Sequence, residues 1–384
     1  MIHPSARVMG KLCTLVLGLA AGPAVAAITD APAPATPSKI KVETFAEGLD
    51  HPWGMQFLPG GRLLVTERPG TMRIVGKDGK LSEPIAGVPK VAAVGQGGLL
   101  DVLLAPDFAT SRIIYFTYGE PREGGKNATA AARAKLVMEG DKGRLEDVKV
   151  IFQQEPAAKS GHHFGSRLVW AKDGTLFITT GERNSLRKES QNPANDIGKV
   201  IRINPDGTIP DDNPKLPGWA PEVWSIGHRN MQGAALRPET GELYEVEHGA
   251  QGGDELNRPE KGKNYGWPVI TYGIDYSGAK IGEGNAKEGM EQPVYYWDPS
   301  IATSGLAFYT GDLFPDWKGN AFVGGLGGAQ IQRLIFKGNE VVAAEALLED
   351  QGKRIRDVRQ GPDGALWALT DDTGEVLRIT PHKY

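Results

Sequence analysis

The feature that most restricts the fold of this 384-residue chain is a phrase that recurs along it. In each copy an apolar strand start leads into a polar turn built on Pro, Asp or Gly, and a second apolar strand follows. Asp-Gly turns between apolar segments are strong hairpin signals, and repeat spacings of roughly 40 to 70 residues fit four-stranded blades with loop insertions. The sequence therefore predicts an all-β fold, a six-bladed β-propeller of four-stranded antiparallel blades. The copies occupy residues 54–65, 99–116, 166–178, 233–244, 304–323 and 357–369.

Two segments precede the predicted propeller. Residues 1–26 carry two basic residues, then an apolar run and the small-residue ending of a secretory cleavage site. This pattern predicts a cleaved signal peptide and a periplasmic or secreted protein. The run is shorter than the roughly 20 apolar residues that a membrane helix needs, so we expect no membrane span. Residues 27–39 are rich in Ala and Pro, which predicts a flexible lead-in, and residues 40–384 are expected to form one propeller domain.

Charge and cysteine content narrow the class of partner. Of the 43 basic side chains, Arg7 and Lys11 lie in the leader, which leaves 41 against 47 acidic ones and a net charge near −6. This balance argues against nucleic acid as a partner. The single cysteine, Cys13, also lies in the leader, so we expect no disulfide in the exported chain. A small ligand is the better expectation.

A propeller scaffold alone does not identify an activity, so function must come from the loops at one end of its channel. His162 and His163 precede the third copy of the phrase. Adjacent residues of an extended segment point to opposite sides, so at most one of them faces the channel. A neutral imidazole there could remove a hydroxyl proton, as alcohol oxidation requires. The alternative is a histidine that hydrogen-bonds loop backbone.

Arginines form a second set of candidates. Arg229 and Asn230 place a charged fork beside an amide, which suits an anionic or quinone-like ligand. Arg354 and Arg356 lie two apart on an expected strand, so both guanidinium groups face the same side. Ion pairs between blades would explain these arginines equally well, with Asp357 or Glu349 as partners of the second pair.

A glycine-rich loop carries the candidate metal ligands. Residues 249–253 expose main-chain carbonyls without obstruction by side chains, and Asp254 and Glu255 follow with carboxylates. Calcium prefers carbonyl and carboxylate oxygens. An ordinary glycine-rich turn is the alternative.

Together these stretches identify a resemblance. The chain resembles the soluble periplasmic quinoprotein sugar dehydrogenases, six-bladed propellers that use pyrroloquinoline quinone (PQQ) and calcium, and it is most similar to their aldose sugar dehydrogenase branch. The resemblance extends from about residue 48 to residue 381. The motifs that carry it are QGGLL at 96–100, HFGSRL at 163–168, GHRNMQG at 227–233, GDE at 253–255, NYGWP at 264–268 and RIRDV at 354–358.

The resemblance implies a PQQ- and calcium-dependent oxidation of aldose sugars to lactones. It implies that His163 takes the proton of the anomeric hydroxyl while hydride passes to the quinone, and that Arg229 stabilises the negative charge that develops there. Asp254 would support the sugar or the base. The residues that the family pattern places around the cofactor are Gln96, Arg229, Asn230, His248, Arg354 and Arg356.

The same resemblance implies two calcium sites. The main-chain oxygens of Gly249 and Ala250 would hold the cofactor-bound ion, and Glu255 and Tyr265 correspond to a second, structural ion. The implied partners are an aldose sugar and an external electron acceptor, and we expect a monomer or homodimer. Glucose-oxidising relatives have a lysine at the position of Gly327 and a glutamine at that of His248, so the resemblance does not extend to a preference for glucose.

Two alternatives come from other classes of protein. A calcium-dependent propeller lactonase, or another hydrolase, would hold a metal at the channel centre, mainly through side chains of Glu, Asn and Asp. A non-enzymatic propeller would bind a sugar or a protein without turnover. The retention of His163 and Arg229 favours the dehydrogenase over both.

Overall fold

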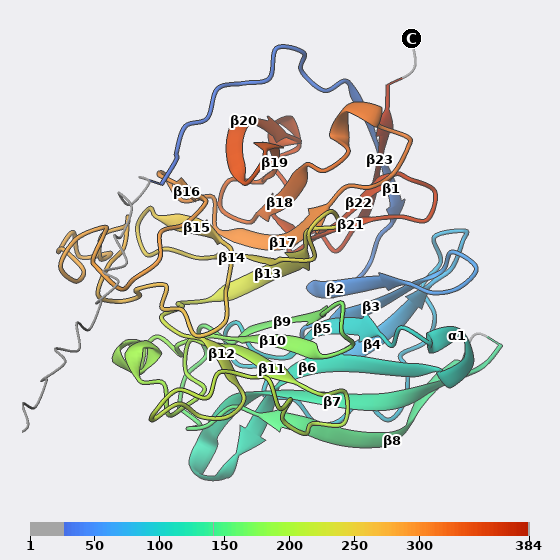
Figure 1. Ribbon diagram of the computed structural model, residues 1–384. Helices are drawn as coiled ribbons and strands as arrows, with labels where there is room; N and C mark the ends of the chain where they lie inside the picture. Colours follow the sequence, from blue (N-terminus) through green and yellow to red (C-terminus); the bar gives the residue numbers. More distant parts are fainter. Residues whose placement is uncertain (1–26, 141, 383–384) are drawn as a thin grey trace, which may run out of the picture.

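The computed structural model describes residues 27–140 and 142–382, so the predicted signal peptide lies outside the described residues. Six antiparallel sheets follow one another along the chain, as the six phrases predict (Figure 1). In chain order their strands are β2 (Pro52–Phe57), β3 (Leu63–Glu67) and β4 (Thr71–Val75); β5 (Leu99–Leu104), β6 (Ile113–Arg122), β7 (Lys126–Glu139) and β8 (Lys142–Gln153); β9 (Gly165–Trp170), β10 (Leu176–Thr180), β11 (Val200–Ile203) and β12 (Val223–Ser225); β13 (Met231–Leu236), β14 (Leu243–Glu247), β15 (Asp254–Asn257) and β16 (Tyr295–Trp297); β17 (Thr303–Phe308), β18 (Ala321–Gly325), β19 (Gln330–Lys337) and β20 (Glu340–Leu347); and β21 (Ile355–Gln360), β22 (Leu366–Thr370) and β23 (Val376–Pro381), which β1 (Ile40–Ala46) completes.

The sheets form a closed ring. Each innermost strand contacts the next one, from β2 through β5, β9, β13, β17 and β21 and back to β2. This arrangement confirms the predicted six-bladed propeller. Helical structure within the described residues is limited to α1 (Phe108–Ser111) and the 3-10 turns η1 (Glu123–Gly125), η2 (Arg187–Gln191), η3 (Pro315–Trp317) and η4 (Glu349–Gln351). In this part of the chain no helix has the length and apolar character needed to cross a membrane.

One blade departs from the predicted four strands. The β2–β3–β4 sheet has three, and an irregular segment takes the place of the fourth. Leu81 forms an isolated bridge with Val75, and the Ile85 N–H donates to the Met72 carbonyl at 2.8 Å. Pro84 lies in this segment and has no N–H to donate, so a regular ladder cannot continue through it.

The two ends of the chain meet in the last blade. β1 pairs antiparallel with β23, and Figure 1 shows them side by side. The segment 27–39 reaches β1 along the outside of the molecule, where Ile28 pairs with Tyr295 and the Ala344 N–H donates to the Pro32 carbonyl at 3.0 Å. Two blade edges thus supply partners for part of the backbone of this predicted lead-in.

Turn chemistry repeats between distant blades. The Asp-Gly turns at Gly174 and Gly364 have φ angles of 83° and 78°, in the left-handed region that glycine adopts without strain. In both turns the preceding Asp accepts the N–H of the residue after the glycine, at 2.9 and 3.1 Å. Equal local chemistry thus produces equal hairpins about 190 residues apart in the sequence.

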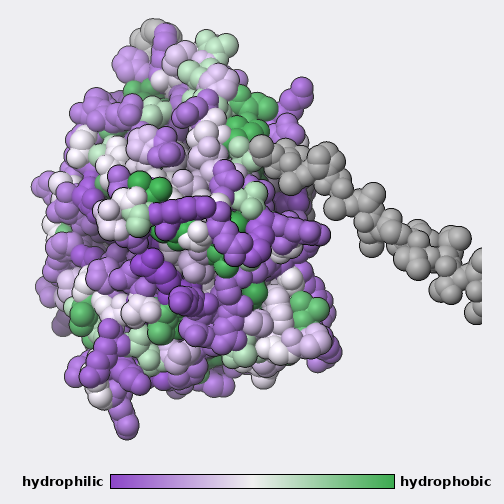
Figure 2. Space-filling view, turned by 90° about the vertical axis from the view of Figure 1, so that its left-hand side faces the viewer, coloured by the Kyte–Doolittle hydropathy of each residue, from purple (hydrophilic) through white to green (hydrophobic). Residues whose placement is uncertain are grey.

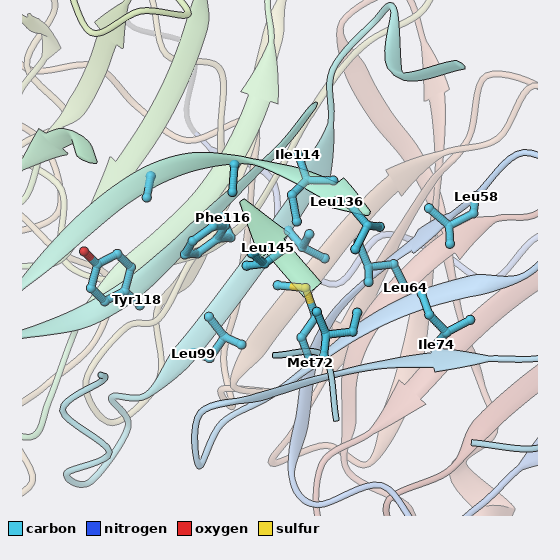
Figure 3. Packing of buried hydrophobic residues seen from close by; sticks show 14 of the residues in the cluster. Leu58, Leu64, Met72, Ile74, Leu99, Ile114, Phe116, Tyr118, Leu136 and Leu145 are labelled. Atoms are coloured by element: carbon cyan, nitrogen blue, oxygen red, sulfur yellow. The ribbon is translucent and has the colours of Figure 1, made fainter. Parts of the chain in front are cut away.

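Apolar packing between neighbouring blades forms the core. β3, β10, β14, β18 and β22 are buried along their whole length, because blades cover both of their faces. Figure 3 shows one such layer, in which Leu64 and Met72 of the first blade pack against Leu99, Phe116 and Leu136 of the second. Burial on both faces explains why apolar side chains stand at consecutive positions in these strands rather than only at alternate ones.

A buried ion network crosses the axis of the ring. Arg167 on β9 lies 2.8 Å from Asp101 on β5 and 3.3 Å from Asp357 on β21, and all three side chains are fully buried. Arg359 adds contacts of 3.5 and 3.3 Å to the same two carboxylates. The Arg167 Nε–H donates to the Gln232 carbonyl on β13 at 2.9 Å. The network thus joins four of the six innermost strands.

Replacing Arg167 with Met should lower the free energy of unfolding by about 3–5 kcal/mol, because the change leaves Asp101 and Asp357 buried without their main counter-charge. Urea denaturation measures the difference. The matched control is Lys263→Met, whose partly exposed pair with Glu291 is 2.9 Å long and should contribute about 1 kcal/mol or less. Equal effects of the two variants would contradict a structural role for the axial network.

Candidate functional site

The predicted site residues converge on one end of the central channel. Innermost strands of a propeller run in the same direction along the axis, so the residues that precede them meet at one mouth. The structure thereby brings together side chains from four blades. Gln96 lies shortly before β5, His163 before β9, Arg229 and Asn230 before β13, and Arg354 before β21.

His163 occupies a constrained position in this mouth. Its backbone has a left-handed φ of 50°, which is uncommon outside glycine. Its N–H donates to Gln96 Oε1 at 2.9 Å, and its Nδ1 lies 2.5 Å from Glu182 Oε1. His163 is 6% exposed, whereas its neighbour His162 is on the surface. Of the two adjacent histidines, only His163 is buried in the site.

Burial and positive charge keep this imidazole neutral. Burial lowers the pKa of His163 to about 2, and the charge of Arg229 is the next cause. Burial also raises the pKa of Glu182 to about 7, against the charges of Arg229 and Arg187. A neutral ring whose Nδ1–H donates to Glu182 keeps the lone pair on Nε2. Nε2 is then the atom that can accept a proton.

Glu182 is a site residue that the sequence analysis missed. It follows β10 in the polar stretch 181–184, and Arg183 and Asn184 there have φ angles of 61° and 60°. Two consecutive non-glycine residues in the left-handed region are unusual and often mark functional sites. Polarity at the end of a buried strand was the signal that could have indicated Glu182.

Buried donors without partners surround Arg229. Its N–H donates to the Glu247 carboxylate, and its Nη1 donates to the His248 carbonyl at 3.2 Å. Its Nε has no hydrogen-bond partner in the described chain, and neither do Asn230 Nδ2 and His248 Nε2. Unpaired buried donors are costly and call for an explanation. An acceptor-rich ligand would satisfy Arg229 Nε and Asn230 Nδ2, and it would satisfy His248 Nε2 in the tautomer that carries its proton there.

Arg354 and Arg356 face the same side, as their spacing predicts, and they share Asp371. Arg356 binds this carboxylate through Nε and Nη2 at 3.1 and 2.9 Å, and Arg354 Nε lies 3.7 Å away. The expected partners Asp357 and Glu349 are therefore wrong for this pair. The Arg354 side chain is 44% exposed, so its guanidinium remains accessible to a ligand.

The glycine-rich loop is shaped by Asp254. This buried carboxylate accepts the Gly249 N–H at 2.8 Å and the Thr303 N–H at 3.3 Å. A side chain on Gly249 would lie 2.1 Å from the Gly252 carbonyl oxygen, so the loop needs glycine there. In this structure both oxygens of Asp254 bind main-chain amides. Its contact with Gly249 fixes the backbone that presents the carbonyls of Gly249 and Ala250.

An acidic cluster lies behind this loop. Glu245 and Glu247 are buried and Glu255 is partly buried, with one imidazole, that of His228, beside them. One ligand atom each from His228, Glu245 and Glu247 lie within 4.8 Å of one another. Asn257 Nδ2 donates to Glu247 and Glu255 at 3.0 and 3.2 Å. Both oxygens of Glu245 lack hydrogen-bond partners in the described part of the chain.

The charges in this cluster do not balance. Burial opposes the charge of His228, but Glu245 and Glu247 outweigh it and raise its pKa to about 9. Burial, followed by the charge of Glu247, raises the pKa of Glu245 to about 7 and that of Glu255 well above its ordinary value. Three ionised carboxylates with one imidazolium would leave two excess negative charges. A divalent cation would restore neutrality.

A small cavity lies next to this cluster. Its volume is about 10 Å³, and its lining includes Glu247, Glu255 and Tyr265. This volume is close to the minimum for one water-sized occupant, which suits a single ion. The Tyr265 hydroxyl donates to the Arg258 carbonyl at 2.5 Å, and its ring stacks on His228 at 4.8 Å. The hydroxyl is thus engaged elsewhere and leaves the main-chain oxygen of Tyr265 as its possible metal ligand.

Comparisons with known proteins agree on one family. The profile described as "Glucose / Sorbosone dehydrogenase" matches residues 49–378. The aldose sugar dehydrogenase YliI of Escherichia coli (strain K12) is 46% identical over 353 residues, which cover 90% of this chain and 94% of the relative. A crystal structure of a glucose dehydrogenase is 49% identical, with a TM-score of 0.86 and coverage of 90% and 100%. The PQQ-bound aldose sugar dehydrogenase of Streptomyces coelicolor is 31% identical, with a TM-score of 0.76 and coverage of 91% and 100%.

Nuclear magnetic resonance of the ring nitrogens should find two buried histidines in opposite states. Between pH 5 and 8, His163 should stay neutral because burial and Arg229 lower its pKa, and His228 should stay charged because Glu245 and Glu247 raise its pKa. As a control, the histidines of the urea-unfolded chain should titrate near pH 6.5. A charged His163 at pH 7 would contradict the assignment of Nε2 as a proton acceptor.

Proposed function

Because this chain belongs to the glucose/sorbosone dehydrogenase family, we propose that it oxidises aldose sugars at the anomeric carbon to lactones, using PQQ and calcium. One observation carries this proposal beyond family membership. The neutral His163, held by Glu182, shares the channel mouth with two buried donors, Arg229 Nε and Asn230 Nδ2, that have no partner among the described residues. A base beside an unfilled set of donors is what hydride abstraction from a hydroxyl-bearing carbon requires.

The donors suit the chemistry of the cofactor. PQQ carries quinone carbonyls and carboxylates, and it therefore presents acceptors and negative charge. Arg229, Asn230 and His248 would bind the part of the ligand nearest His163, while Arg354 would bind a carboxylate at the exposed side. Gln96 uses Oε1 to hold the His163 N–H, and its amide group would contact the cofactor through Nε2.

Proton transfer is the part of the reaction that this chain performs with its own side chains. When bound, the quinone would supply a two-electron acceptor for the hydride of the anomeric carbon, and calcium would supply Lewis-acid activation of it. His163 Nε2 takes the proton of the anomeric hydroxyl, so the sugar loses two electrons and two hydrogens and becomes the lactone. Glu182 stabilises the imidazolium through Nδ1, and Arg229 stabilises negative charge at the accepting carbonyl.

The low pKa of His163 has a cause that an anionic ligand would weaken. The positive charge of Arg229 is the second contribution to that low value. Negative groups bound at Arg229 would offset this charge and raise the pKa of His163 toward the range of an effective base. The proposal therefore assigns the cofactor site a second effect, the strengthening of the base.

Two sets of oxygen atoms suit calcium. The carbonyls of Gly249 and Ala250 would hold the ion that accompanies the quinone, with Asp254 fixing their geometry. Glu255 and the main-chain oxygen of Tyr265 would hold a second ion, which the small cavity and the excess of carboxylates accommodate. The second ion would have a structural role, because it lies behind the glycine-rich loop.

The hydrolase alternative finds less support. It needs side-chain carboxylates at the channel centre that are free to bind a metal. At the axis Asp101 and Asp357 are paired with Arg167 and Arg359 instead.

We also propose export to the periplasm or the outside, on the pattern of residues 1–26, and an external electron acceptor. These last proposals rest on the sequence.

The purified apoprotein should oxidise aldoses in a dye-linked assay only when both PQQ and calcium are added. The reason is that PQQ supplies the electron acceptor and calcium its activation. A panel of hexoses, pentoses and disaccharides with each addition omitted in turn is the measurement. Activity without PQQ, or hydrolysis of lactones with no sugar oxidation, would overturn the proposal.

Substituting His163 with Gln should lower kcat by about 10²- to 10⁴-fold, the usual contribution of a general base. PQQ binding, followed by the absorbance of the quinone, should change little because Arg229, Asn230 and Arg354 remain. His162→Gln is the matched control, since this neighbouring ring lies on the surface, and it should leave kcat unchanged. Retained turnover in the His163 variant would remove this residue from the role of base.

A further inference from the structure

A fully buried lysine has no role in the reaction as derived. Lys199 directly precedes β11 in the third blade and is 0% exposed. The face of the molecule in Figure 2 is mainly hydrophilic, with hydrophobic residues in small separate groups, as expected where charged side chains stay at the surface. Lysine is almost never fully buried unless it is paired. The partners of its ammonium therefore define the role of Lys199.

Four oxygen atoms surround this ammonium. Lys199 Nζ donates to the main-chain carbonyls of Ile197, Glu189 and Ser190 at 2.5, 2.9 and 3.2 Å, and Asn195 Oδ1 lies 3.4 Å away. We call these four atoms the carbonyl cage. None of them carries a formal charge, and main-chain carbonyls of this kind bind K⁺ elsewhere by replacing its water shell. The ammonium thus occupies the place that a small monovalent cation would take.

Two carboxylates act on the charge of Lys199 without belonging to the cage. Burial lowers the pKa of Lys199 to about 7, and the negative charges of Asp196 and Glu189 oppose this effect. Both carboxylates have other partners, because Asp196 Oδ2 accepts the Glu155 N–H at 2.9 Å and Glu189 Oε2 accepts the Asn195 amide at 2.7 Å. The oxygens of the cage are therefore the atoms that replace water around the ammonium.

The cage joins η2 to the chain that enters β11. Glu189 and Ser190 lie near the end of η2, and the last carbonyls of a helical turn lack partners within it. Lysine side chains often bind such carbonyls. Asn195 and Ile197 belong to the segment that leads into β11. Lys199 therefore fastens η2 to this segment.

Ser190 extends the connection into the site. Its carbonyl accepts Lys199 Nζ and also the Gly227 N–H, the latter at 2.9 Å. Gly227 lies two residues before Arg229, and the Arg229 carbonyl accepts the Glu182 N–H at 2.9 Å. One series of contacts thus runs from the ammonium to Arg229 and on to Glu182, which holds the proposed base.

The main chain around Lys199 supports the same connection. The Lys199 N–H donates to Thr180 Oγ1 at 3.0 Å, and the Thr180 N–H donates to the Lys199 carbonyl at 2.9 Å. The carbonyl of the preceding residue, Gly198, accepts the His228 N–H at 3.1 Å. A side chain on Gly198 would lie 2.3 Å from the His228 carbonyl oxygen, so the two segments are in close contact. Displacement of Lys199 would therefore disturb both segments that carry site residues.

We propose that Lys199 is a positioning residue whose ammonium acts as an internal monovalent cation, fixing η2 and, through Ser190, the main chain that carries Arg229. This inference rests on the proposed function, because Arg229 and Glu182 are assigned there to the cofactor and the base. Without the ammonium, the buried carbonyls of the cage lose a donor, which is costly. The same cage would then accept a small cation from solution.

Lys199→Met removes the charge while keeping a long, unbranched side chain. We expect amide hydrogen exchange at Gly227 and Glu182 in the apoprotein to become at least about 10-fold faster, since buried carbonyls without donors weaken this region locally. In the holoenzyme reconstituted with PQQ and calcium, kcat should fall by about 10- to 100-fold, because small displacements of reacting groups are costly. The KM for the aldose should change little, since Lys199 acts on Arg229 and Glu182 rather than on sugar binding.

Lys318→Met is the matched control. Lys318 pairs with Asp312 at the surface, and its side chain is 53% exposed, so this variant should leave both exchange and kcat unchanged. Unchanged exchange and kcat in Lys199→Met as well would overturn the positioning role.

Lys199→Ala distinguishes a cation from a side chain that only fills space. Methylammonium or K⁺, present during refolding because the cage is closed to solvent, should restore most of the lost kcat and slow the amide exchange again. Choline at the same ionic strength is too large for the cage and should restore neither. Equal kcat in methylammonium, K⁺ and choline would overturn the cationic role.

The native protein allows a test that needs no variant. Lys199 is the only lysine among the buried residues of the described chain. Magnetic resonance of the lysine Nζ atoms in the nitrogen-labelled apoprotein, at about pH 5 and thus below the pKa of Lys199, should show one ammonium whose hydrogens exchange slowly with water. The absence of such a signal would overturn the cage.

These measurements separate the two proposals. Faster exchange at Gly227 in Lys199→Met, in a protein that oxidises no aldose, would support the positioning role of the ammonium and refute the proposed function. Aldose oxidation that Lys199→Met leaves unchanged, with unchanged exchange, would refute the positioning role and leave the proposed function intact.

Discussion

The geometry of the site depends on the buried ion network at the propeller axis. Arg167 joins Asp101 and Asp357 across the ring, and its Nε–H reaches the backbone of the fourth blade at Gln232. Each of these residues is close in sequence to a site residue. Arg167 follows His163 by four positions, and Asp357 directly follows Arg356. A shift of one innermost strand would therefore displace His163, the arginines and the glycine-rich loop relative to one another.

Most of the fold follows from local chemistry that is visible in the sequence. The phrase at each blade encodes a buried strand, a turn and a second buried strand, and the turns at Gly174 and Gly364 show that equal residues produce equal geometry. What the sequence could not provide depends on distant partners. Composition alone predicts a flexible segment at 27–39, because the blade edges that bind Ile28 and Pro32 come from residues near 295 and 344. The irregular fourth strand near Pro84 similarly depends on pairing that proline interrupts.

The residues of the site also fall into those that the sequence could predict and those that depend on distant contacts. Motif residues such as His163, Arg229 and Arg354 were identifiable, because each belongs to a polar stretch beside a strand. Glu182 and the carboxylates of Glu245 and Glu247 were not. Their significance comes from burial and from contacts across strands, and periodicity reports neither. The partner of Arg354 and Arg356 was wrong for the same reason, since Asp371 lies on the next strand connection and only pairing brings it near.

The carboxylate of Glu247 lies between a region that favours an anion, on the side of the channel, and a region that favours a cation, behind the glycine-rich loop. On the side of the channel, Arg229 Nε, Asn230 Nδ2 and His248 Nε2 have no partner among the described residues. Behind the glycine-rich loop, both Glu245 oxygens lack a hydrogen bond from the described residues, although His228 Nδ1 lies 3.5 Å from Oε1. Glu247 lies between the two regions, because one of its oxygens accepts the Arg229 N–H and the other accepts Asn257 Nδ2. An anionic ligand on one side and a cation on the other would each remove an electrostatic cost, and Glu247 would transmit the position of one to the other. The folded chain alone thus leaves both sites electrostatically incomplete, and the two ligands would stabilise the fold as well as permit the reaction.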